Sequence, residues 1–97
     1  MAQVIFSTEA LADLERLSEF LVEKAPEAAA DILSYMLDAV GILAGHPLVG
    51  RRVEEELREL VVSRGHSGYL ALYVFDAARD VVRILRIRHQ REAGYRD

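Results

Sequence analysis

Cationic side chains gather near the C-terminal end of the chain, and they are Arg86, Arg88, His89 and Arg91. Arginine suits paired hydrogen bonds to carboxylate or phosphate groups, so this cluster could contact an acidic surface on a partner. The ordinary alternative is an exposed strand end with salt bridges, because charged side chains are mostly solvated. Glu54, Glu55 and Glu56 are then the expected partners. Composition alone favours this alternative.

Tyr95 follows the cluster in a polar tail. Tyr35, Tyr69 and Tyr73 stand in apolar segments instead, and we expect them to pack in the core or across strands. The polar setting of Tyr95 leaves two interpretations open, which are packing against the body of the protein and contact with a partner.

The other residue types that commonly bind metals or act as nucleophiles show no spacing typical of such sites. His46, His66 and His89 are far apart and show no metal-ligand spacing. The serines form no nucleophile motif, and Ser7 is expected to cap a helix. The chain has no cysteine, which excludes disulfides and thiolate metal sites. We therefore expect no catalytic residue, metal or cofactor.

The composition fits one globular domain, residues 1–97, with 52% hydrophobic and 29% charged residues. No apolar run approaches the length of about 20 residues that spans a membrane, and the first residues do not resemble a signal peptide. We expect a cytoplasmic protein without a membrane partner.

Charge is distributed unevenly along the chain, whose net charge is −4. Residues 1–50 hold two cations against eight acids, whereas residues 51–97 hold ten arginines against eight acids. A protein that mainly grips a nucleic-acid backbone is usually basic overall. We therefore expect no direct nucleic-acid binding, although a local cationic patch remains compatible with the sequence.

The last third of the chain predicts strands at residues 60–63, 69–75 and 81–87, which are rich in β-branched and aromatic side chains. Short breaks separate them, so the three strands are expected to pair as an antiparallel meander. In the last strand, alternation places Leu85 and Ile87 on one face and Val82 and Ile84 on the other. The charged residues 51–56 are expected to form a loop or a short helical turn.

The first half predicts an edge strand at residues 3–6 and two helices, residues 8–24 and 27–44, from apolar side chains at helical spacing. Pro26 suits the first position of the second helix, and Gly45 and Pro47 suit its end. The short link makes the helices an antiparallel hairpin, which we expect to cover the Leu85 and Ile87 face. The order β-α-α-β-β-β is an α+β fold.

Four stretches of the sequence match the pattern of a known family. They are FSTEALADLERLSEFL (residues 6–21), LAGHPLVGRRV (43–53), LRELVVSRGHSGYLALYVFD (57–76) and DVVRILRIRHQRE (80–92). In this order and in a chain of this length, they resemble the ParE/RelE toxin superfamily of bacterial type II toxin–antitoxin systems. The resemblance covers nearly the whole chain.

The resemblance implies one of two activities. RelE-like members are ribosome-dependent mRNA interferases, which need cations on the sheet to stabilise charge at the phosphate. Here residues 60–63 contain no lysine, Leu70 follows Gly68 and Tyr69, and Arg91 and Tyr95 are the remaining candidates. The ending IRHQRE is more similar to ParE, the plasmid-stabilisation toxin that inhibits DNA gyrase by binding.

The main hypothesis is a ParE-like toxin whose residues 88–97 carry toxicity, with Arg86, Arg88, His89, Arg91 and Tyr95 as target-binding candidates. The resemblance also implies a cognate antitoxin and a hetero-oligomer, in which a foldable antitoxin segment docks on the helix hairpin. Leu11, Phe20 and Val22 are candidate antitoxin contacts, each with scattered surface exposure as the alternative. The rival hypotheses are an interferase and an inactive member kept for antitoxin binding.

Overall fold

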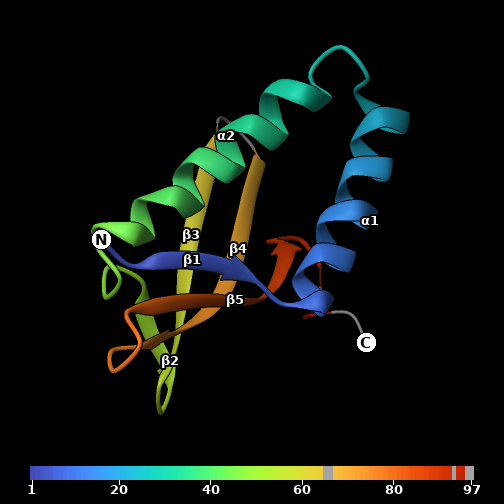
Figure 1. Ribbon diagram of the computed structural model, residues 1–97. Coiled ribbons are helices and arrows are strands. Elements are labelled where there is room, and N and C mark those ends of the chain that lie inside the picture. Colours follow the sequence, from blue (N-terminus) through green and yellow to red (C-terminus); the bar gives the residue numbers. More distant parts are fainter. Residues whose placement is uncertain (65–66, 93, 96–97) are drawn as a thin grey trace.

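A computed structural model describes residues 1–64, 67–92 and 94–95. Figure 1 shows the helices lying over a single sheet, which has five strands in the order β1-β5-β4-β3-β2. The elements are β1 (Gln3–Phe6), α1 (Thr8–Lys24), α2 (Ala29–Gly41), a 3-10 turn (Ile42–Ala44), β2 (Arg51–Glu54), β3 (Leu57–Arg64), β4 (Ser67–Asp76) and β5 (Val81–His89). Strand β1 pairs parallel with β5 at one edge, and the other pairs are antiparallel. The predicted α+β class, edge strand and meander are confirmed.

Strand β2 corrects the expectation of a loop or helical turn at residues 51–56. It pairs antiparallel with β3, and Glu55, with φ 45°, lies in the connection between them. All four residues of β2 are exposed at the edge of the sheet. Charged side chains are common on edge strands because they discourage pairing with other chains, and they remove the apolar alternation that marks a strand in sequence.

Helix α1 has the predicted bounds, and Ser7 caps it as expected. The Ser7 Oγ accepts a hydrogen bond from Ala10 N over 3.0 Å, which satisfies a free amide of the first turn. Helix α2 begins at Ala29, later than predicted, because Pro26 lies in a turn closed by a bond from Ala28 N to Ala25 O. Its last residues tighten into the 3-10 turn that ends before Gly45.

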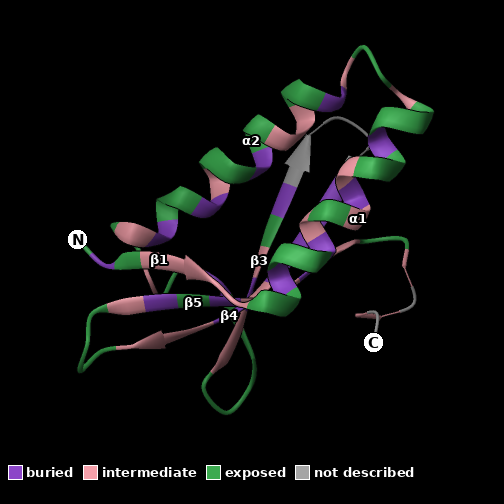
Figure 2. Cartoon of the chain, turned by 45° about the vertical axis from the view of Figure 1, so that its right-hand side comes forward, coloured by how far each residue is buried: buried purple, intermediate pink, exposed green. Residues whose placement is uncertain are grey.

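The helix hairpin is open. In Figures 1 and 2, α1 and α2 meet at their link and diverge from there over the sheet. Both helices turn their buried side chains inward, and the core joins Leu17, Met36, Val40 and Leu43 to Val62, Tyr69, Ala71, Tyr73, Val82, Ile84 and Ile87 of the strands. In the described residues, no helix has the length and apolar character needed to cross a membrane.

A β-bulge at Leu85 corrects the predicted faces of β5. Leu72 pairs with Arg86 and Tyr73 pairs with Ile84, so Leu85 is an extra residue without a partner on β4. A bulge reverses the alternation of side chains beyond it. Ile84 and Ile87 therefore both lie in the core beneath the helices, and the prediction that Leu85 and Ile87 share the covered face is wrong.

Helix α1 covers the edge of β5 where β1 ends. Strand β1 pairs with β5 as far as Ile84. Beyond that point Ser7 Oγ donates to Leu85 O over 2.9 Å, and Ile87 N donates to Asp13 Oδ2 over 2.8 Å. These contacts satisfy backbone groups that would otherwise be unpaired. They also place the end of β5 and the residues after it against α1.

Candidate functional site

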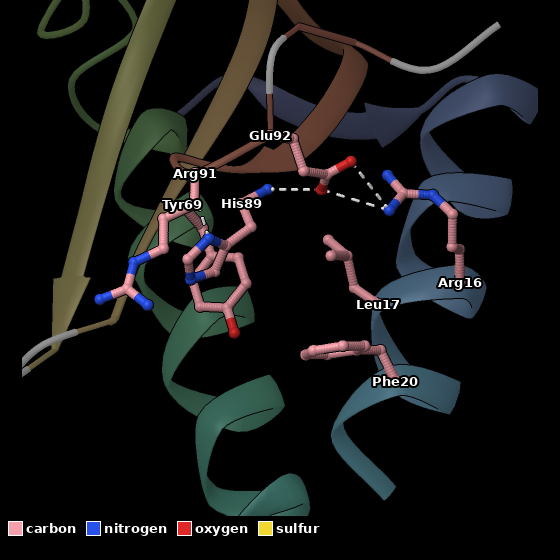
Figure 3. Close-up of a pocket in the computed structure, with 7 residues that line it drawn as sticks. All are labelled: Arg16, Leu17, Phe20, Tyr69, His89, Arg91 and Glu92. Atoms are coloured by element: carbon pink, nitrogen blue, oxygen red, sulfur yellow. Dashed lines mark hydrogen bonds and ion pairs between the residues drawn. The ribbon is translucent and has the colours of Figure 1, made fainter. Parts of the chain in front are cut away.

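A pocket of about 400 Å³ lies between α1 and the ends of β4 and β5. We call it the wedge pocket, and its lining residues are Arg16, Leu17, Phe20, Tyr69, His89, Arg91 and Glu92. In Figure 3, Leu17 and Phe20 lie on one side and Tyr69 and His89 on the other, with Arg16 and Glu92 at one end. Most of the contact surface inside is apolar, so the pocket suits a hydrophobic side chain.

The ring of His89 is held in the pocket wall. It packs edge-on against Tyr69, with ring centroids 5.1 Å apart, and its Nδ1 accepts a hydrogen bond from Arg91 N over 3.1 Å. Burial lowers the pKa of His89, and the charge of Arg91 lowers it further, while Glu92 acts in the opposite direction. Burial also raises the pKa of Tyr69. Both shifts favour the neutral form of the side chain.

The imidazole of His89 is expected to titrate below its ordinary pKa of 6.5. A depressed folded pKa means that the neutral form stabilises the fold above pH 6.5, and that this contribution is lost as the pH falls through the folded pKa. An NMR titration of the His89 ring measures the midpoint directly. The Arg91→Gln variant should shift the midpoint back upward, and a wild-type midpoint at or above 6.5 contradicts this description of the pocket wall.

Arg86 is engaged within the protein. Its Nε and Nη2 donate to the two carboxylate oxygens of Asp13 on α1, over 2.9 and 3.2 Å. Asp13 is 4% exposed, and Arg16 lies 3.7 Å from the same carboxylate. Among the described residues, the ion pair of Arg86 is with Asp13 rather than with Glu54 to Glu56, and it joins the sheet to α1.

Arg88 holds the segment that follows β5. Its Nη1 donates to Glu92 O over 2.7 Å, and its guanidinium lies 5.3 Å from the ring centre of Tyr95. The guanidinium of Arg86 lies 5.7 Å from the same ring. Both distances are in the range of cation–π attraction. Tyr95 thus packs against the body of the protein, as the first of the two interpretations expects, and its contact with a partner stays a prediction.

Glu59 completes this cluster from β3. The Tyr95 hydroxyl donates to Glu59 Oε2 and Arg51 Nη2 donates to Glu59 Oε1, each over 2.8 Å. Burial alone would raise the pKa of Glu59, but the bonds from Arg51 and Tyr95 and the charges of Arg51 and Arg88 hold it below its ordinary value. Burial and the bond to Glu59 raise the pKa of Tyr95 well above its ordinary value. We call Arg51, Glu59, Arg86, Arg88 and Tyr95 the Tyr95 clasp.

The wedge pocket and the Tyr95 clasp lie on opposite faces of the sheet. Tyr69 pairs with His89, and the neighbouring residue Leu70 pairs with Arg88, so alternation sends these two pairs to opposite sides. The target-binding candidates are thereby divided. His89 and Arg91 belong to the pocket, whereas Arg86, Arg88 and Tyr95 belong to the clasp. Their role in target binding stays a prediction.

The candidate antitoxin contacts differ in their surroundings. Leu11, Phe20 and Val22 are 54%, 56% and 58% exposed on α1, and Phe20 lines the wedge pocket. Among the described residues, no group of His, Asp and Glu side chains is arranged to hold a metal ion. His66, one of the three histidines considered as ligands, lies outside the described residues.

Sequence reasoning missed three acidic groups of these sites, Asp13, Glu59 and Glu92. Asp13 carried a signal, because it lies three residues after Ala10 and four before Leu17, inside the apolar stripe of α1. Glu59 and Glu92 carried none, since each acquires its partners through pairing of distant segments. The sequence therefore pointed to the C-terminal cations of these sites, but not to their counter-charges or to Arg16 and Arg51.

The chain matches the family model described as "ParE toxin of type II toxin-antitoxin system, parDE" over residues 4–94. It is 38% identical over 92 residues to Toxin RelE3 of Caulobacter vibrioides, covering 95% of this chain and 98% of that protein. It is 37% identical over 89 residues to Toxin RelE2 of the same organism, covering 92% of this chain and 96% of that protein.

Solved structures show the same fold. The chromosomal ParDE system from P. aeruginosa matches with a TM-score of 0.74 at 24% identity, covering 92% of this chain and 96% of that chain. The RelBE2 toxin–antitoxin complex of Mycobacterium tuberculosis matches with a TM-score of 0.57 at 31% identity, covering 92% and 98%. From the family model and these relatives, the chain belongs to the ParE/RelE family of toxins of type II toxin–antitoxin systems.

Proposed function

We propose that this toxin inhibits DNA gyrase by binding it, without enzymatic activity, and that a cognate antitoxin neutralises it. The observation that carries the proposal is the chemistry of the sheet face opposite the helices. Val61 pairs with Leu70, and Leu70 pairs with Arg88, so apolar residues stand in register where cleavage of RNA would need cations. Arg86 and Arg88 of this face are engaged with Asp13, Glu92 and Tyr95.

Tyr95 is poorly suited to proton transfer. Its hydroxyl donates to a carboxylate, and its pKa is raised well above the ordinary value. Efficient general acid–base catalysis needs a pKa near the working pH. Arg91, the other candidate for RNA cleavage, lies at the wedge pocket on the opposite side of the sheet. This separation supports a binding role for the C-terminal segment.

The rival activity has one observation in its favour. Two relatives over most of the chain are named RelE toxins, and RelE-like members cleave mRNA on the ribosome. However these relatives are named, Val61 and Leu70 are apolar residues at positions where RNA cleavage would need cations. Gyrase binding therefore remains the proposal. The proposed target places the action of the toxin in the cytoplasm.

We propose that the antitoxin docks at the open helix hairpin and inserts an apolar side chain into the wedge pocket. Neighbours of the same fold come from toxin–antitoxin complexes, which supports a hetero-oligomer. The pocket presents Leu17 and Phe20 opposite Tyr69 and His89. Interfaces gain most of their affinity where a few such anchors fill desolvated pockets.

The Phe20→Ala variant is expected to weaken antitoxin binding by at least about tenfold, because it removes an aromatic wall of the pocket. The Val49→Ala variant is the control, since Val49 is as exposed as Phe20 but lies outside the pocket lining, on the loop before β2. Calorimetric titration with the cognate antitoxin measures both affinities. Equal losses for the two variants would contradict docking at the pocket.

Induced expression without antitoxin tests the proposed target in cells. Filamentation with a DNA-damage response is the result expected of a gyrase inhibitor. Rapid arrest of translation with cleaved mRNA would instead identify an interferase. Healthy growth, with folded protein confirmed, would identify an inactive member retained for antitoxin binding.

A further inference from the structure

The described residues after β5 are 90–92 and 94–95, and we call them the segment. Backbone hydrogen bonds fix its first residues to the sheet. Gln90 N donates to Gly68 O over 2.9 Å, and Glu92 N donates to His89 O over 3.0 Å. Arg88 Nη1 donates to Glu92 O over 2.7 Å. These contacts turn the chain at the end of β5, beside the start of β4, so the segment has a defined path up to Glu92.

The Tyr95 clasp fixes the same segment further along. Tyr95 lies against Arg86 and Arg88 and is hydrogen-bonded to Glu59. Glu59 is 6% exposed, although it stands on the sheet face that the helices do not cover. A buried carboxylate costs free energy unless charged or hydrogen-bonding groups satisfy it, and its partners are Arg51 and Tyr95.

We propose that Glu59 is a positioning residue for toxicity: acting through Tyr95, it holds residues 90–92 and Tyr95 in the arrangement that contacts the protein target. This inference rests on the proposed function, because it says how the target-binding segment is organised. A hydrogen bond from a hydroxyl to a charged carboxylate is roughly twice as strong as a hydrogen bond between neutral groups. A preorganised segment also loses less conformational entropy when it binds.

Amide hydrogen exchange of the segment tests the clasp without any target. The Tyr95→Phe variant removes the hydroxyl and keeps the ring over the arginines, so exchange at Gln90, Arg91 and Glu92 should become about tenfold faster. Glu59→Ala should have a similar effect. The double variant should exchange no faster than either single variant, because both substitutions remove the same bond. Glu56→Ala, at an exposed acid on the β2–β3 turn, is the control and should change nothing.

Unchanged amide exchange in Tyr95→Phe and Glu59→Ala would show that the bond between Tyr95 and Glu59 does not hold the segment. If Glu59→Ala fails to fold, Glu59→Gln replaces it, and exchange should still quicken because the acceptor loses its charge. Gyrase inhibition should fall in the variants that loosen the segment. A loosened segment with full inhibition would overturn the positioning role. A wild-type chain that does not inhibit gyrase would overturn the proposed function, while the exchange data still decide the clasp.

Discussion

Replacing Asp13 with alanine is expected to lower the free energy of unfolding by about 3 kcal/mol, a typical loss when one partner of a buried ion pair is removed. Asp13 is 4% exposed and accepts bonds from Arg86 and from the backbone of Ile87. The substitution removes the carboxylate that accepts from both donors, at the place where α1 covers the edge of β5. Alanine is the better helix former, so helix propensity opposes this loss and does not cause it.

Urea unfolding followed by circular dichroism measures the effect. Glu15→Ala is the matched control, because it removes an exposed acid of the same helix two residues away. Asp13→Asn should lose less than Asp13→Ala, since an amide oxygen can still accept from Ile87 N. If Asp13→Ala is no more destabilising than Glu15→Ala, the ion pair is not what attaches α1 to β5.

A chain that ends at Glu92 is expected to lose gyrase inhibition by about hundredfold or more, as when a central binding anchor is removed. It lacks Tyr95, so Arg88 loses its contact with the Tyr95 ring and Glu59 loses its bond from the Tyr95 hydroxyl. The residues that line the wedge pocket are all retained, and antitoxin binding should persist. Titration of DNA supercoiling and calorimetry with the antitoxin measure the two properties on one protein.

A chain that ends at Tyr95 is the control for this truncation, because it keeps the clasp. It should inhibit gyrase nearly as well as the full chain. A chain that ends at Glu92 and still inhibits fully would remove the C-terminal segment from the mechanism. Parallel loss of antitoxin binding would show that the truncation disturbs the wedge pocket as well.

The local spacing of apolar residues predicted most of the fold. The apolar stripe and the Ser7 cap defined α1 to the residue, and β-branched and aromatic runs marked β3, β4 and β5. Periodicity failed at Leu85, because one inserted residue reverses a strand's faces without changing its composition. It failed again at β2, where an exposed edge strand has no core to impose alternation.

The candidate site was predictable only in part. Arginines near the end of the chain and the apolar Phe20 stand out in the sequence, but their arrangement depends on pairing between distant segments. Tyr95 reaches Glu59, 36 residues earlier, and Arg86 reaches Asp13, 73 residues earlier. Sequence alone therefore grouped His89 and Arg91 with Arg86 and Arg88, whereas the structure places the first two at the wedge pocket and the other two in the Tyr95 clasp.

Supercoiling of relaxed DNA by purified gyrase, titrated with the antitoxin-free toxin, tests the central claim most directly. Inhibition should saturate as the toxin binds gyrase, and the same preparation should cleave no mRNA when it is added to translating ribosomes. Undiminished supercoiling at a large excess of folded toxin would contradict the account, and cleaved mRNA in the ribosome reaction would replace it with an interferase.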